Sequence, residues 1–123
     1  MIRQPMTTRI LILKSAAGRY ERLEQYFQAR HYVVTWLDDA RRVPGQIEQA
    51  EPALLLIDLA TPHTEIFSLI ESIHLAYPDL PQIVISEAKQ GNRAQQALQS
   101  GAYAVTWQPF AMFEEWRFTV NRA

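Results

Sequence analysis

The chain has 123 residues, of which 48% are hydrophobic and 20% are charged, the size and balance of one globular domain with a core of its own. Twelve basic and thirteen acidic side chains give a net charge of -1, so no bulk positive field favours nucleic acid or an anionic membrane surface. The absence of cysteine excludes disulfide frameworks, thiolate catalysis and cysteine-ligated zinc.

The apolar runs and the amino terminus bear on where the chain acts. The longest uninterrupted apolar run, 53–57, is far shorter than the roughly 20 residues that a membrane-spanning helix needs. The first residues, Met1 to Pro5, lack the apolar stretch of a secretory signal. We therefore expect a cytoplasmic protein with no membrane partner, in which residues 1–8 form an amino-terminal extension and residues 9–123 form one domain.

Apolar strand patterns and amphipathic helix patterns alternate along the whole chain. Five short segments are apolar and mostly rich in β-branched or aromatic residues, which is typical of buried strands: 10–13, 32–37, 53–57, 83–85 and 103–107. Each is followed by a predicted helix. In most of these helices the apolar residues recur at helical spacing, and the second follows a break in the chain. The predicted helices are 20–27, 46–50, 66–77, 94–98 and 113–120. Strands joined by helical crossovers predict an α/β fold, a five-stranded parallel sheet with helices on both faces.

The carboxyl ends of the predicted strands are the place to look for a functional site, because open parallel sheets bind ligands there. The residues at or just past these ends are Lys14, Ser15, Asp58, Ser86 and Gln108. Asp58 ends a fully apolar strand, where an unpaired buried carboxylate is costly. It is therefore either a solvated strand-end residue or a functional carboxylate. Asp38 and Asp39 are better explained as a turn and a helix cap.

Five segments in this order and spacing resemble the receiver domain of two-component response regulators, from about Arg9 to the end of the chain. The matching segments are 9–13, 52–59 together with Pro62, 81–86, 97–102 and 108–110. The resemblance implies a flavodoxin-like sheet in the order 2-1-3-4-5. It also implies a signalling module rather than an enzyme, one that receives a phosphoryl group from a histidine kinase on the aspartate at the position of Asp58.

The residues around Asp58 depart from the pattern that the resemblance implies. Ser86 matches the hydroxyl position after the fourth strand, but Lys14 and Ser15 stand where the family has an acidic pair that holds Mg²⁺. Gln108 stands where the family has a lysine, and Val105 where it has an aromatic switch residue. We therefore expect a degenerate receiver without a cofactor. Lys14 is expected near Asp58, as its ion-pair partner at a solvated strand end.

Two alternatives stay open. One is a functional receiver that is modified at Asp58 by a histidine kinase, with Mg²⁺ as its cofactor. The other is a small flavodoxin-like enzyme or flavin carrier, although the loop 14–18 lacks the hydroxyl-rich character of a phosphate cradle. The three histidines, His31, His63 and His74, are scattered without ligand spacing, so we expect no metal site.

The end of the chain carries the candidates for protein contacts. Trp107 lies beside the predicted site, and Trp116 and Arg117 belong to the predicted last helix. Aromatic and arginine side chains are enriched at protein interfaces. We therefore expect a partner protein, a neighbouring regulatory or output domain, or a second copy of the chain to bind here. Acidic residues interrupt the arginines in the first part of the chain, which argues against nucleic-acid contact.

Overall fold

The structure, a computed structural model, describes residues 8–16, 18, 20–61, 65–87 and 91–108. Its strands are β1 (Arg9–Leu13), β2 (Val33–Leu37), β3 (Leu54–Asp58), β4 (Gln82–Glu87) and β5 (Ala104–Gln108). Its helices are α1 (Glu21–Ala29), the 3₁₀ helix η1 (Ala40–Arg42), α2 (Val43–Ala50), α3 (Ile66–Ala76) and α4 (Gly91–Ser100). The predicted helix over 113–120, with Trp116 and Arg117, lies outside these residues, as does His63.

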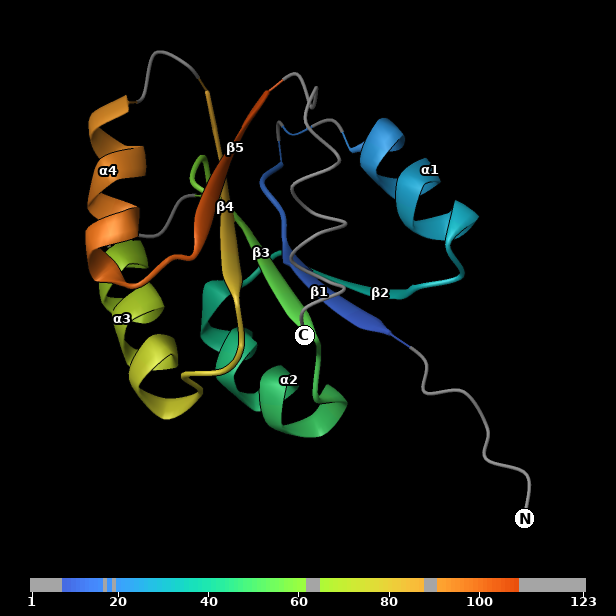
Figure 1. The fold of residues 1–123 in the computed structure, drawn as a ribbon, viewed down its shortest axis with the longest axis horizontal. Coiled ribbons are helices and arrows are strands. Elements are labelled where there is room, and N and C mark those ends of the chain that lie inside the picture. Colours follow the sequence, from blue (N-terminus) through green and yellow to red (C-terminus); the bar gives the residue numbers. More distant parts are fainter. Residues whose placement is uncertain (1–7, 17, 19, 62–64, 88–90, 109–123) are drawn as a thin grey trace.

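The five strands form one parallel sheet in the order β2-β1-β3-β4-β5 (Figure 1). This confirms the predicted architecture and strand order. The chain first steps from β1 to β2 on one side and then crosses to β3 on the other side of β1. Leu13 pairs with Ile57 in the register of β1 and β3, so the loop after β1 and the end of β3 meet at the point where the strand order reverses. Such switch points are where parallel sheets bind ligands.

The core consists of two layers because side chains alternate across the sheet. On one face, Ile10 and Ile12 of β1 pack in a cluster with Leu23 and Phe27 of α1. On the other face, Leu11 and Leu13 belong to a cluster that also takes residues of four further helices, among them Ile47 of α2, Ile70 of α3 and Ala97 of α4. The continuous apolar run in β3 is buried throughout, as expected for a central strand with helices on both faces.

Local turns match the sequence in two places. The carboxylate of Asp39 caps η1 by accepting a hydrogen bond from the backbone N–H of Arg41 at 3.0 Å, which confirms the predicted cap. Gly101 ends α4 with a φ of +123°, and a Cβ there would lie 2.7 Å from the His74 ring. Gly101 therefore lets α4 end against α3. No helix of the described segments is long and apolar enough to span a membrane.

Candidate functional site

Asp58 is enclosed at the end of β3 by hydrogen-bond donors from three places in the chain. Its side chain is only 3% exposed. Its Oδ2 atom accepts hydrogen bonds from the Tyr20 hydroxyl at 2.6 Å and from the Ser15 hydroxyl at 3.1 Å. Its Oδ1 atom accepts one from the backbone N–H of Ala60 at 2.9 Å. The carboxylate is thus buried and satisfied by the chain itself, as a buried charge must be.

Tyr20 supplies the shortest of these contacts and comes from the residue just before α1. Its hydroxyl accepts a hydrogen bond from the backbone N–H of Ser15 at 2.8 Å while it donates to Asp58. Burial, followed by the hydrogen bond to Asp58, raises the pKa of Tyr20 to about 12. The hydroxyl therefore keeps its proton at neutral pH. The ring also packs on Trp36 of β2, with 5.5 Å between the ring centroids.

The loop between β1 and α1 leaves room for Tyr20 only because residue 18 is a glycine. A Cβ on Gly18 would overlap the hydroxyl oxygen and the Cζ atom of Tyr20. The backbone N–H of Gly18 donates to the carbonyl of Ser15 at 3.3 Å, which closes the turn. Gly18 thus allows the Tyr20 ring to lie across the turn and reach Asp58.

Lys14 does not pair with Asp58, so the expectation of a solvated Lys14–Asp58 ion pair is wrong. The Lys14 side chain is exposed, and the ion pair within the described ranges joins Arg41 to Asp39. The reason is that the Ser15 and Tyr20 hydroxyls cover the carboxylate and exclude water from it. Lys14 instead borders a hollow of about 390 Å³ beside Tyr20, which Glu21, Glu24 and Trp36 also line.

The other predicted site residues lie on β4 and β5 at the same edge of the sheet. Ser86 of β4 is 2% exposed, and its neighbour Ile85 pairs with Asp58 in register. The backbone of Ser86 pairs with Trp107, and Glu87 pairs with Gln108. The side chains of Trp107 and Gln108 are not among those described. Val105 is partly buried and packs on the α2–α4 side of the core. The roles of these residues stay predictions.

The side chains around Asp58 do not fit a divalent cation. Mg²⁺ prefers oxygen ligands, with carboxylates foremost, but Ser15 and Tyr20 both direct hydroxyl protons toward the Asp58 carboxylate. Within the described part of the chain, no group of three His, Cys, Asp or Glu side chains could hold a metal ion. Lys14, which follows β1, brings a positive charge in place of a ligand.

The described histidines lie apart from each other and from this site. His31 follows α1 with a φ of +59°, and His74 belongs to α3 and packs near Gly101. Among the described contacts, neither histidine reaches a residue at the carboxyl end of β3.

Sequence reasoning missed the role of Tyr20 at this site, because it placed Tyr20 in the apolar stripe of α1 with Leu23 and Phe27.

The comparisons with known proteins agree with this fold. The family described as "Response regulator receiver domain" matches residues 10–114. The transcriptional regulatory protein KdpE of Staphylococcus aureus (strain NCTC 8325 / PS 47) is 30% identical over 109 residues, which cover 89% of this chain and 47% of that protein. The chain therefore spans about half the length of this curated relative.

Solved structures with low sequence identity share the same fold. A CheY-like receiver domain protein from Methanospirillum hungatei JF-1 is 22% identical with a TM-score of 0.80, covering 95% of this chain and 96% of that one. The signal receiver domain of an HD domain-containing protein from Pseudomonas fluorescens Pf-5 is 18% identical with a TM-score of 0.83, covering 99% and 93%. Together with the family match, they lead to one conclusion: the chain belongs to the response regulator receiver domain family.

Proposed function

We propose that the chain is a degenerate receiver, a signalling module that acts by protein–protein contact and neither catalyses turnover nor accepts a phosphoryl group at Asp58 with Mg²⁺. The observation that carries this proposal is the 2.6 Å hydrogen bond from the Tyr20 hydroxyl to Asp58. In this proposal residues 9–123 are the domain, residues 1–8 are an extension, and the module acts in the cytoplasm.

The first argument concerns the lone pairs of Asp58. An ionised carboxylate offers about four lone-pair positions, and the chain's own donors take three of them. A carboxylate oxygen must present a free lone pair to attack phosphorus, and hydrogen bonds to both oxygens draw electron density away from them. Asp58 is therefore a poor nucleophile until Tyr20 moves.

The second argument concerns charge. A carboxylate and a phosphoryl group repel each other, so the reaction needs positive charge where the negative charge develops. A glutamine side chain such as that of Gln108 can donate a hydrogen bond but carries no charge, and the exposed Lys14 makes no ion pair with Asp58. The described residues near Asp58 thus offer hydroxyl groups where the chemistry needs cations.

The third argument concerns the surface left for a partner. A module whose site cannot switch must present one permanent binding surface. The candidate is the face formed by α4, β5 and the predicted last helix over 113–120, with Trp107, Trp116 and Arg117 as contact residues. Two large apolar side chains of this region are exposed, Leu98 of α4 at 45% and Tyr103 at 49%. Its proposed partners are a neighbouring output domain, another protein or a second copy of the chain.

Labelling with acetyl phosphate and Mg²⁺ tests the proposal. We expect intact-mass spectrometry to find no phosphoryl group on the parent chain. The variant Lys14→Asp/Ser15→Asp/Tyr20→Phe/Gln108→Lys restores the ligands and the charge, and we expect it to be labelled. Adding Asp58→Asn to that variant should abolish the label. Labelling of the parent at Asp58 would instead establish the alternative, a phospho-acceptor served by a histidine kinase and Mg²⁺.

A second experiment tests the partner surface. We expect Trp107→Ala combined with Arg117→Glu to abolish self-association, or binding of the output domain, without changing the circular dichroism spectrum. Light scattering measures the oligomeric state. An unchanged state in this double variant would place the interface elsewhere.

A further inference from the structure

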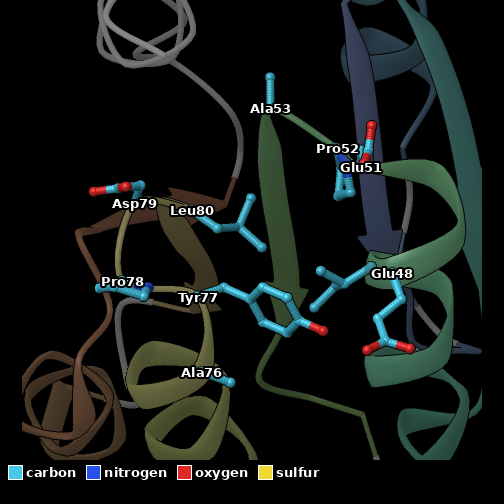
Figure 2. A pocket seen from close by; sticks show the side chains of 10 residues that line it. Glu48, Glu51, Pro52, Ala53, Ala76, Tyr77, Pro78, Asp79 and Leu80 are labelled. Carbon is cyan, nitrogen blue, oxygen red and sulfur yellow. The ribbon is translucent and has the colours of Figure 1, made fainter.

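A second hollow lies at the opposite end of the sheet from Asp58, between α2 and α3 (Figure 2). It has a volume of about 710 Å³, within the range of sites that bind ligands. Its apolar lining comes from the last turn of α2, the segment that joins α2 to β3, the end of α3 and the segment that joins α3 to β4: Ile47, Pro52, Ala53, Ala76, Tyr77, Pro78 and Leu80. We call this hollow the α2–α3 groove.

The charge of the α2–α3 groove has one sign. Three of its ten lining residues are acidic, Glu48, Glu51 and Asp79, and none is basic. All three are exposed, and none is in an ion pair with another described residue. Arg9 of β1 reaches the end of α2, where its guanidinium donates a hydrogen bond to the backbone carbonyl of Ala50 at 3.0 Å. The groove therefore keeps a negative charge that the described chain does not neutralise.

The carboxyl ends of two helices also lie at this groove. The last turn of α2 supplies Ile47 and Glu48, and the end of α3 supplies Ala76 and Tyr77. The unpaired carbonyls at the carboxyl end of a helix carry partial negative charge and favour cations. At α2 the Arg9 guanidinium binds the last carbonyl, so it is the field of the α3 end that acts in the same direction as the three carboxylates.

The backbone conformation and the charge of Glu51 are both unfavourable for the stability of the fold, which points to a role in binding. Its φ of +48° lies in the left-handed region, where glycine or asparagine is preferred after a helix. It also places an acid at a helix carboxyl end, where a negative charge is destabilising. Residues that are strained in this way cluster at binding sites, and Glu51 lines the α2–α3 groove.

Tyr77 gives the groove a flat aromatic wall. Its side chain extends from the end of α3 toward α2, with the hydroxyl directed to the side where Glu48 lies (Figure 2). Burial and the neighbouring charge and hydrogen bond of Glu48 raise the pKa of Tyr77, so the hydroxyl stays neutral. A guanidinium stacks on such a ring and pairs with carboxylates in a planar fork better than an ammonium does.

We propose that the α2–α3 groove binds an arginine-bearing segment of a partner protein. Separate arginines of this segment pair with Glu48 and with Glu51, whose carboxylates point to different sides (Figure 2), and an aliphatic stem and an adjoining apolar side chain cover Tyr77 and Leu80. A peptide fits better than a small cation because the groove joins an apolar floor to an acidic rim. This surface is separate from the α4–β5 face, and the proposal holds whether or not Asp58 accepts a phosphoryl group.

The test is an NMR titration of the ¹⁵N-labelled chain with a capped peptide of alternating arginine and leucine. We expect the amide shifts to concentrate in residues 47–53 and 76–80. Glu51→Gln should weaken binding about two- to fivefold, the range for loss of one exposed ion pair. Glu71→Gln makes the same charge change on an exposed site of α3 outside the groove, and it should leave the affinity unchanged.

A second variant separates binding from folding. Glu51→Gly removes both the left-handed strain and the unfavourable charge, so we expect it to raise the melting temperature while it weakens peptide binding to the same extent as Glu51→Gln. Equal peptide affinity in Glu51→Gly and the parent would overturn the proposal. Shifts centred on the hollow beside Glu21 and Glu24 would also overturn it.

Two further arms test other occupants of the groove. The same shifts at the same concentration of capped arginine alone would show that a small cation suffices, which would overturn a peptide site. Self-association of the parent that is lost in Glu51→Gln but kept in Glu71→Gln would make a second copy the occupant, and this too would overturn the proposal. Neither effect is expected.

Discussion

Acidic side chains at the two ends of the sheet have opposite surroundings. At the carboxyl end, Asp58 is buried and accepts hydrogen bonds from Ser15, Tyr20 and Ala60. At the amino end, the acidic side chains of the α2–α3 groove are exposed and have no cation among the described residues. A carboxylate that its own chain satisfies contributes to stability and has little left for a ligand. Exposed carboxylates that have no cation remain available to the charged group of a partner.

The largest expected effect is on the carboxyl end, from Asp58→Asn. The three donors reach both carboxylate oxygens, so either orientation of an amide leaves at least one donor facing the NH₂ group. We expect the free energy of unfolding to fall by about 2–3 kcal/mol, as for lost hydrogen bonds to a buried charged group. Urea unfolding measures it. Asp38→Asn, on an exposed side chain, is the control and should change stability by less than about 0.5 kcal/mol.

Two glycine variants should act in opposite directions. Gly18→Ala introduces a Cβ that overlaps the Tyr20 hydroxyl, so we expect it to break the contact with Asp58 and cost about 2 kcal/mol. Gly45→Ala meets no atom within 4 Å and lies in α2, where alanine favours the helix, so it should stabilise by about 0.5–1 kcal/mol. Thermal unfolding measures the change in stability of both variants. A stable Gly18→Ala would mean that Tyr20 does not need its position over the turn.

A smaller loss is expected from Tyr20→Phe. This variant keeps the ring on Trp36 but removes the donor to Asp58 and the acceptor for the Ser15 N–H. We expect a cost of about 1.5 kcal/mol, the low end for a hydrogen bond to a charged group. Tyr32→Phe, on a partly exposed ring that packs on Phe27, serves as the matched control. Equal stability of the two variants would show that the Tyr20 hydroxyl does not hold Asp58.

The last effect is absent at neutral pH and is a dependence of stability on alkaline pH. The pKa of Tyr20 rises from 10.0 to about 12 on folding, so the folded chain holds a proton that the unfolded chain releases. The stabilisation is complete below pH 10 and is lost as the pH rises through about 12. We expect unfolding free energies to fall more steeply in this range for the parent than for Tyr20→Phe. Equal slopes would contradict the assignment.

The fold was predictable from the sequence because its signals are local. The run 53–57 has no polar residue, which indicates burial on both faces, and the spacing of Ile66, Ile70 and Ile73 fits one helix face. Each pattern lies within one element. The alternation of strands and helices then leaves few arrangements for a parallel sheet.

The site was predictable only in part because its contacts are not local. The end of β3 identified Asp58, but its main donor lies 38 residues away. Tyr20 shares its spacing with Leu23 and Phe27, yet it precedes the first turn of α1, so the helical period does not fix its direction. Lys14 follows the last residue of β1, where the pleat no longer sets which way a side chain points. The position of Lys14 directly after β1 therefore suggested an ion pair with Asp58 that the fold does not form.

The most direct test of the central claim, that Tyr20 and Ser15 leave Asp58 unable to support Mg²⁺ binding, is a Mg²⁺ titration followed by the fluorescence of Trp36. Trp36 packs on Tyr20 at 5.5 Å, so any displacement of Tyr20 by a cation changes its surroundings. Trp107→Phe and Trp116→Phe leave Trp36 as the single reporter. We predict no saturable change at sub-millimolar Mg²⁺. A saturable sub-millimolar response that Asp58→Asn abolishes would contradict the account.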